Sequence, residues 1–211
     1  VLREFHEGII ALSACLAGEV PRYIEKGMIE EAEKAALKYE ECFGKGNYFL
    51  ELQDHGIPLQ STVNAALIGM SKKLDIPLVC TNDVHYTYAE DVEPHDILLC
   101  IQTGKTLSDE NRMRYEGGQY YVKSEEEMKG LFPYAWEAVE NTQRIADRCH
   151  VEIEFGVTKL PKYEVPDRFT SLSYLEYLCE RGMQERYPEG GEELKERLSY
   201  ELGVIRDMGY V

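Results

Sequence analysis

Ile76-Pro77-Leu78-Val79-Cys80 is almost entirely apolar, and this stretch decides the fold. A strand without alternation of polar and apolar residues is typical of a parallel sheet or a barrel, where helices cover the sheet. A second short strand is predicted upstream at Tyr48-Phe49-Leu50-Glu51-Leu52. Helical spacing of apolar residues precedes each strand, at 29–43 and at 60–74. The alternation of helix and strand therefore predicts an α/β fold with a parallel sheet.

The downstream sequence predicts more helices and then a change of character. Ser124 and Glu127 have the spacing of a capping box at a helix start. After Cys149 the chain is extended, with prolines at 161 and 166, and we place a domain boundary between 155 and 156. The domains are thus 1–155 and 156–211. The predicted elements are helices at 89–102, 124–132, 135–149, 171–187 and 192–208, and a strand at 119–123.

Composition excludes several classes of protein. A formal charge of −16 argues against this chain being the main nucleic-acid-binding surface, because phosphate binding needs clustered Lys and Arg. No apolar run approaches the roughly 20 residues that span a bilayer, so we predict no membrane partner and a cytoplasmic location. The six cysteines contain no Cys-x-x-Cys pair, and we expect most of them to be buried thiols. An acidic balance suits protein partners, or carboxylates around a cation.

Three polar motifs follow predicted strands. Asp83-Val84-His85 comes after 76–80, Asp54-His55 follows 48–52, and Cys15 follows the apolar run 9–12. Each motif alone is commoner as a capped turn or, for Cys15, as a small buried side chain. Because catalytic groups gather at the carboxyl ends of parallel strands, the three motifs can converge on one site. Such a cluster suits a divalent zinc, manganese or iron ion and metal-assisted phosphoester hydrolysis.

The chain resembles a known family in several segments, in order. Residues 10–19, 49–58, 76–86 and 95–105 are similar to the later half of the PHP (polymerase and histidinol phosphatase) domain of bacterial DNA polymerase III alpha subunits. The resemblance continues through 141–151, 160–166 and 197–210, where that family passes into its palm. It implies a partial PHP-type distorted β/α barrel followed by a mainly helical start of the polymerase palm.

The resemblance also implies a ligand set. Cys15, Asp83 and His85 match family ligands of a metal cluster, whereas Asp54, His55 and Asn82 are candidates to support those ligands without touching the metal. The family's His-x-His motif would lie upstream of Val1, and its magnesium-binding aspartates beyond Val211. Because both ends look cut, we expect an internal fragment, inactive by itself, in which the three ligands splay while their backbones stay poised.

The implied parent is a replicative DNA-directed DNA polymerase, which extends DNA from deoxynucleoside triphosphates with magnesium. The resemblance implies that its PHP site supports 3′-5′ exonuclease activity, as in some relatives, and that its partners include the sliding clamp and a proofreading exonuclease subunit. The one locally basic loop holds Lys105, Arg112 and Arg114, which are the candidates for a DNA backbone contact. Two alternatives stay open: a non-catalytic docking module for a separate proofreading exonuclease subunit, and a free-standing PHP phosphatase.

Overall fold

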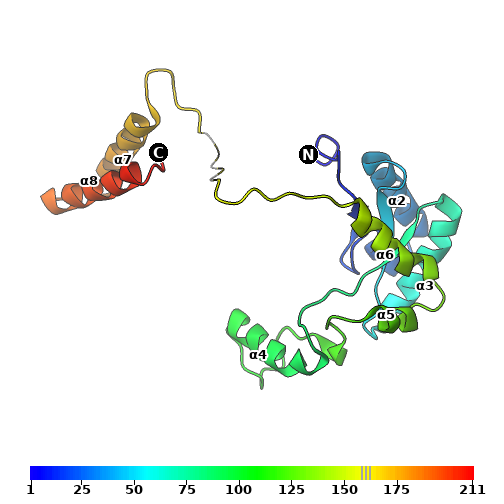
Figure 1. The fold of residues 1–211 in the computed structure, drawn as a ribbon. Coiled ribbons are helices and arrows are strands. Elements are labelled where there is room, and N and C mark those ends of the chain that lie inside the picture. Colours follow the sequence, from blue (N-terminus) through cyan, green and yellow to red (C-terminus); the bar gives the residue numbers. More distant parts are fainter. Residues whose placement is uncertain (158, 160, 162) are drawn as a thin grey trace. The chain divides into compact units, whose positions relative to one another are not determined.

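The computed structural model describes residues 1–157, 159, 161 and 163–211, in two compact units, Val1–Val151 and Glu152–Val211. The division lies close to the predicted boundary between 155 and 156. The first unit contains the sheet and most of the helices, and the second contains two helices (Figure 1). Residues 158, 160 and 162 of the predicted extended connection lie outside the described residues, and two of them, 160 and 162, also belong to the family match at 160–166.

The elements of the first unit alternate as predicted. Its strands are β1 (Ala11–Leu12), β2 (Tyr48–Leu52) and β3 (Leu78–Cys80). Its helices are α1 (Glu19–Glu25), α2 (Ile29–Phe43), α3 (Pro58–Leu74), α4 (Val92–Thr103), α5 (Glu125–Leu131) and α6 (Trp136–Arg148), with 3₁₀ turns at Ala89–Asp91 and Glu116–Gly118. All the helices predicted in this unit are confirmed, and α1 is an addition.

The strands form a parallel sheet in the order β1-β2-β3. Ala11 pairs with Tyr48 across the first interface, and Leu50 pairs with Leu78 across the second. This arrangement confirms the predicted parallel α/β fold, and it sets the carboxyl ends of all three strands along one edge.

The predicted strand at 119–123 is wrong, because the structure forms only an isolated bridge there, between Tyr86 and Tyr121. The rest of the segment 119–123 is an irregular loop rather than a strand. The backbone N–H groups of His85 and Tyr86 both donate to the carbonyl oxygen of Tyr120, at 2.8 and 3.3 Å. One more bond, from the N–H of Val122 to the carbonyl oxygen of Thr87 at 3.3 Å, belongs to this contact, which does not extend into a ladder.

The core lies where helices cover the sheet. Helices α2 and α3 pack on β2, while α6 packs on β3. The Asn141 side-chain amide of α6 donates to the carbonyl oxygen of Leu78 at 2.7 Å, which fixes that helix to the strand. The largest fully buried apolar side chains in this core are Tyr48, Phe132, Leu50, Leu52, Leu67 and Ile76.

The expectation that most cysteines are buried is wrong. Only Cys80 and Cys100 are buried among the six, all of which are free thiols. The exposed pair, Cys15 and Cys149, lie just beyond a strand and a helix, where the chain turns toward the surface. The burial of each cysteine therefore depends on where its secondary-structure element lies, and not on how often cysteines are buried on average.

The predicted capping box begins α5. The Ser124 hydroxyl accepts the N–H of Glu127 at 3.2 Å, and the Glu127 carboxylate accepts the N–H of Ser124 at 2.7 Å. Loss of a capping hydroxyl costs about 0.5–2 kcal/mol. We expect Ser124→Ala to lower the free energy of unfolding by that amount in denaturant titrations. Ser61→Ala, on the exposed surface of α3, is the matched control and should be neutral or slightly stabilising; equal losses in both variants would refute the capping role.

The second unit consists of α7 (Ser171–Arg186) and α8 (Glu192–Asp207), which pack against each other. Thr170 caps α7 by accepting the N–H of Ser173 at 3.2 Å. Neither helix has a fully buried residue, so this pair by itself encloses no core. No helix in the described part of the chain is long and apolar enough to cross a membrane.

Candidate functional site

Polar residues extend from the carboxyl ends of the three parallel strands, along one edge of the sheet. They occupy Ser13–Cys15 after β1, Gln53–His55 after β2 and Thr81–His85 after β3. The Glu51 carboxylate ties these ends together. It accepts the N–H of Ala14 at 3.0 Å, the Gln53 side-chain amide at 3.2 Å and the Thr81 hydroxyl.

Sequence reasoning missed Glu51. The available signal was its charge, because it is the one ionisable carboxylate within the apolar strand β2. A carboxylate in such a position needs hydrogen-bond donors, and the neighbouring strand ends supply them. Glu51 thus belongs to the framework of the site.

Asp83 and His85 lie together. The Nε2 atom of His85 is 3.3 Å from a carboxylate oxygen of Asp83, and both side chains reach solvent. Asp83 has a φ of 46°, in the left-handed region that non-glycine residues rarely adopt. Such backbone strain persists only when the surroundings hold it in place, and it is concentrated at functional sites.

Cys15 lies three residues beyond the end of β1, which β2 separates from β3. Its thiol is exposed beside a small hollow, which Glu51, Gln53 and Gln60 also line. Among the described residues, no three histidine, cysteine or carboxylate side chains are grouped closely enough to hold a metal ion. A thiol, an imidazole and a carboxylate are nevertheless the donors that suit a zinc-like or iron-like ion.

His55 is anchored inside the protein. It is 3% exposed, and its Nε2 lies 2.8 Å from the carbonyl oxygen of Asn82. Its Nδ1 lies 2.9 Å from the Gln60 side-chain amide nitrogen. A carbonyl only accepts and an amide NH₂ only donates, so these two contacts fit the tautomer that carries its proton on Nε2. Nε2 therefore holds the loop after β3, while Nδ1 is bound by Gln60 of α3.

Asp54 and Asn82 have different local roles. Asp54 accepts the N–H of Gly56 at 3.0 Å, which forms a turn of the Asx type after β2. Asn82 donates its amide to the carbonyl oxygen of Tyr121 and accepts from Lys123 at 3.1 Å. Asn82 is thus the link between the loop of Asp83 and residues far along the chain.

The basic loop is only partly free to contact a phosphate. The Arg112 side chain is 6% exposed, and its guanidinium makes a two-pronged ion pair with Asp96, with one N–O distance of 2.6 Å. This guanidinium holds the pKa of Asp96 below its usual range. Arg114 donates to the carbonyl oxygen of Asp109 at 3.1 Å and remains exposed, as does Lys105. Lys105 and Arg114 are therefore more accessible than Arg112, which is occupied by Asp96.

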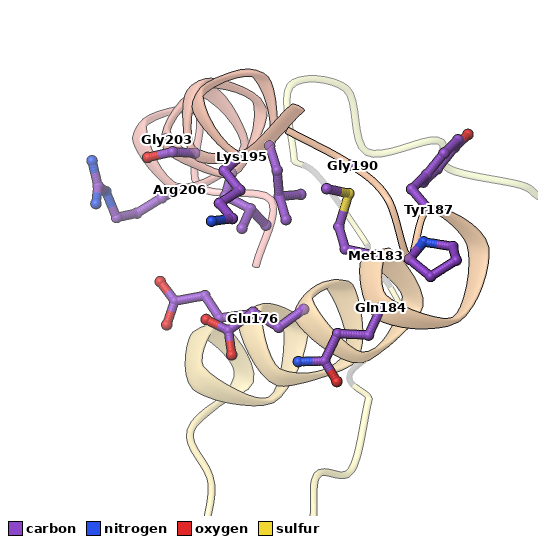
Figure 2. A pocket seen from close by; sticks show the side chains of 13 residues that line it. Glu176, Met183, Gln184, Tyr187, Gly190, Lys195, Gly203 and Arg206 are labelled. Carbon is purple, nitrogen blue, oxygen red and sulfur yellow. The ribbon is translucent and has the colours of Figure 1, made fainter. Parts of the chain in front are cut away.

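A groove of about 710 Å³ lies between α7 and α8 (Figure 2). Glu176 of α7 and Lys195 of α8 line its opposite sides, and Met183 contributes apolar surface. Its described lining contains glutamates and cations but no aspartate, histidine or cysteine. The two glutamates, Glu176 and Glu180, share the groove with the cations Lys195 and Arg206, and we assign it no catalytic role.

Comparison with known proteins gives a consistent result along the whole chain. Residues 1–55 match the family model described as "PHP domain". The chain is 46% identical over its full length to "DNA polymerase III subunit alpha" of Treponema pallidum, and 43% identical over 99% of its length to the protein of that name from Borreliella burgdorferi. The protein of the same name from Thermus aquaticus is 38% identical over 90% of the chain. The chain spans 18% of the first two relatives and 16% of the third.

Proposed function

Because this chain is, along its whole length, a homologue of one segment of DNA polymerase III alpha subunits, we propose that it serves within a replicative DNA-directed DNA polymerase. The observation that carries the proposal is the match over 100% of the chain, which includes α7 and α8 as well as the sheet. A free-standing PHP phosphatase does not explain the match to the second unit. We propose the palm assignment of 156–211 on the same ground.

Within that protein, we propose a divalent metal site at the edge of the sheet. Cys15, Asp83 and His85 would hold the ion, which is zinc, manganese or iron by the chemistry of its donors. A bound divalent ion supplies charge stabilisation at a phosphate and an activated water, as 3′-5′ phosphoester hydrolysis requires. The support from the structure is the shared edge of three parallel strands and the Asp83–His85 pair.

The chain's own residues prepare this site before any ion binds. Glu51 fixes the spacing of the strand ends, because it accepts hydrogen bonds from residues beyond β1, β2 and β3. His55 holds the carbonyl group of Asn82, which restricts the loop that carries Asp83. Neighbours of this kind orient metal ligands and raise metal affinity.

We also propose the wider setting of the polymerase. DNA, deoxynucleoside triphosphates and magnesium would be bound by the longer protein, in the cytoplasm, together with replisome subunits such as the sliding clamp and a proofreading exonuclease. Lys105 and Arg114 are the remaining candidates for a DNA backbone contact. A docking role for the PHP region without metal stays as the alternative, and metal binding by the complete protein separates the two.

Assays of DNA synthesis test the proposed function. The complete protein should extend a primed template in the presence of Mg²⁺, while the 211-residue chain alone should incorporate nothing. The reason is that the described residues contain no cluster of carboxylates able to hold the two ions of nucleotidyl transfer. Incorporation by the isolated chain, or no incorporation by the complete protein, would contradict the proposal.

A further inference from the structure

The segment 119–123 runs beside the loop that carries Asp83 and His85. The carbonyl oxygen of Tyr120 accepts the N–H of His85 at 2.8 Å. The Tyr120 ring stacks on His55, with centroids 4.2 Å apart and 6° between the planes, and it meets the His85 ring edge-on at 5.7 Å. One residue of this segment thus contacts the anchoring histidine and the candidate ligand at once.

Lys123, at the carboxyl end of the segment 119–123, also contacts the loop before Asp83. Its ammonium donates to the side-chain oxygen of Asn82 at 3.1 Å and to the carbonyl oxygen of Gln119. It also lies 4.2 Å from the centroid of the Tyr121 ring. The half-buried lysine therefore bonds the start of its own segment and the residue just before Asp83.

The contacts of Asn82 show why this lysine matters. All of its polar side-chain and carbonyl groups have partners: Lys123 on the amide oxygen, Tyr121 on the amide nitrogen and His55 on the carbonyl. The next residue is Asp83, whose strained φ of 46° needs such neighbours. A hydrogen bond from an ammonium group is generally stronger than one between neutral groups, and Lys123 supplies the one charge-assisted bond of these three.

We propose that Lys123 is a positioning residue which, through Asn82, holds the loop of Asp83 and His85 in the conformation suited to a metal ion. The proposal rests on the proposed metal site, because positioning has meaning only for a ligand pair. Lys123 itself contacts neither candidate ligand in the hydrogen bonds described, and its effect is indirect.

Hydrogen exchange in the complete, metal-free protein tests the first half of the proposal. Lys123→Met removes the donor but keeps the length of the side chain. We expect backbone amides of peptides covering 81–87 to exchange about tenfold faster in this variant, the loss expected for one hydrogen bond to a charged group. Lys123→Arg, which keeps a cationic donor, should retain most of the protection.

Lys129→Met is the matched control. Lys129 is also half-buried, lies 4.9 Å from the Trp136 ring centroid and pairs with Glu125, but it bonds nothing in the loop. Its substitution should leave exchange in 81–87 unchanged. Equal exchange in wild type and Lys123→Met, equal acceleration by Lys129→Met, or an arginine variant as fast as the methionine one would overturn the proposal.

Titration with Mn²⁺ alone tests the second half. We expect Lys123→Met to weaken Mn²⁺ binding to the complete protein by about 10- to 100-fold, the usual effect of removing a residue that orients ligands. Unchanged affinity would refute positioning for the metal. A wild-type protein without Mn²⁺ affinity would refute the proposed metal site instead, and the exchange result would still decide whether Lys123 holds the loop.

Discussion

Leu50→Ala should destabilise the protein by about 2–5 kcal/mol, the range for a leucine truncated in a packed core. Leu50 is 0% exposed in the middle strand β2, where α2 and α3 pack on the sheet. The change removes apolar contacts and leaves a cavity that the paired strands on either side cannot easily close. The free energy of unfolding from urea titrations measures the loss.

Leu37→Ala is the control for the same chemical change at the surface. Leu37 belongs to α2 but is 44% exposed, so its truncation leaves no internal cavity. We expect its effect to stay within about 0.5 kcal/mol of zero. Similar losses in the two variants would show that the sheet is not the centre of the core.

Asp83→Asn should weaken divalent metal binding to the complete protein by at least about 100-fold, since removal of an outer partner alone costs 10–100-fold. The substitution keeps the shape of the side chain but removes the negative charge that a cation requires. Mn²⁺ titration of metal-free protein gives the affinity. Thermal unfolding in the absence of metal should change little, because the Asp83 side chain is 44% exposed.

Asp147→Asn is the charge-matched control, because it removes the same charge from the exposed surface of α6. It should leave Mn²⁺ affinity unchanged. If both variants lost affinity equally, the effect would come from the overall charge, and the assignment of Asp83 as a ligand would fail.

Periodicity predicted the layered part of the fold, since local pattern and tertiary structure agree there. The apolar stretches at 48–52 and 76–80 became β2 and β3, and the helical spacing at 29–43 became α2 with the same bounds. Helix α1 was missed, because it has only seven residues and contains Pro21, a residue that usually argues against a helix. Short elements of this kind depend on packing rather than on propensity.

The site could be predicted only as a set of positions. Strand ends marked Cys15, His55 and the Asp83–His85 pair, because the direction of parallel strands is readable from sequence. Hydrogen bonds and ion pairs between residues far apart in the sequence could not be predicted. Nothing local indicates that Arg112 bonds Asp96 or that Lys123 bonds Asn82, since the tertiary fold alone brings these partners together.

The central proposal is that Cys15 belongs to the same metal site as Asp83 and His85, and cobalt substitution tests it most directly. A Co²⁺ ion bound by a thiolate has a sulfur-to-metal charge-transfer band that oxygen and nitrogen ligands do not give. The complete protein loaded with Co²⁺ should show this band, and Cys15→Ser should abolish it while Cys149→Ser, the other exposed cysteine, leaves it intact. A cobalt-loaded protein without the band, or a band that survives Cys15→Ser, would contradict the shared site.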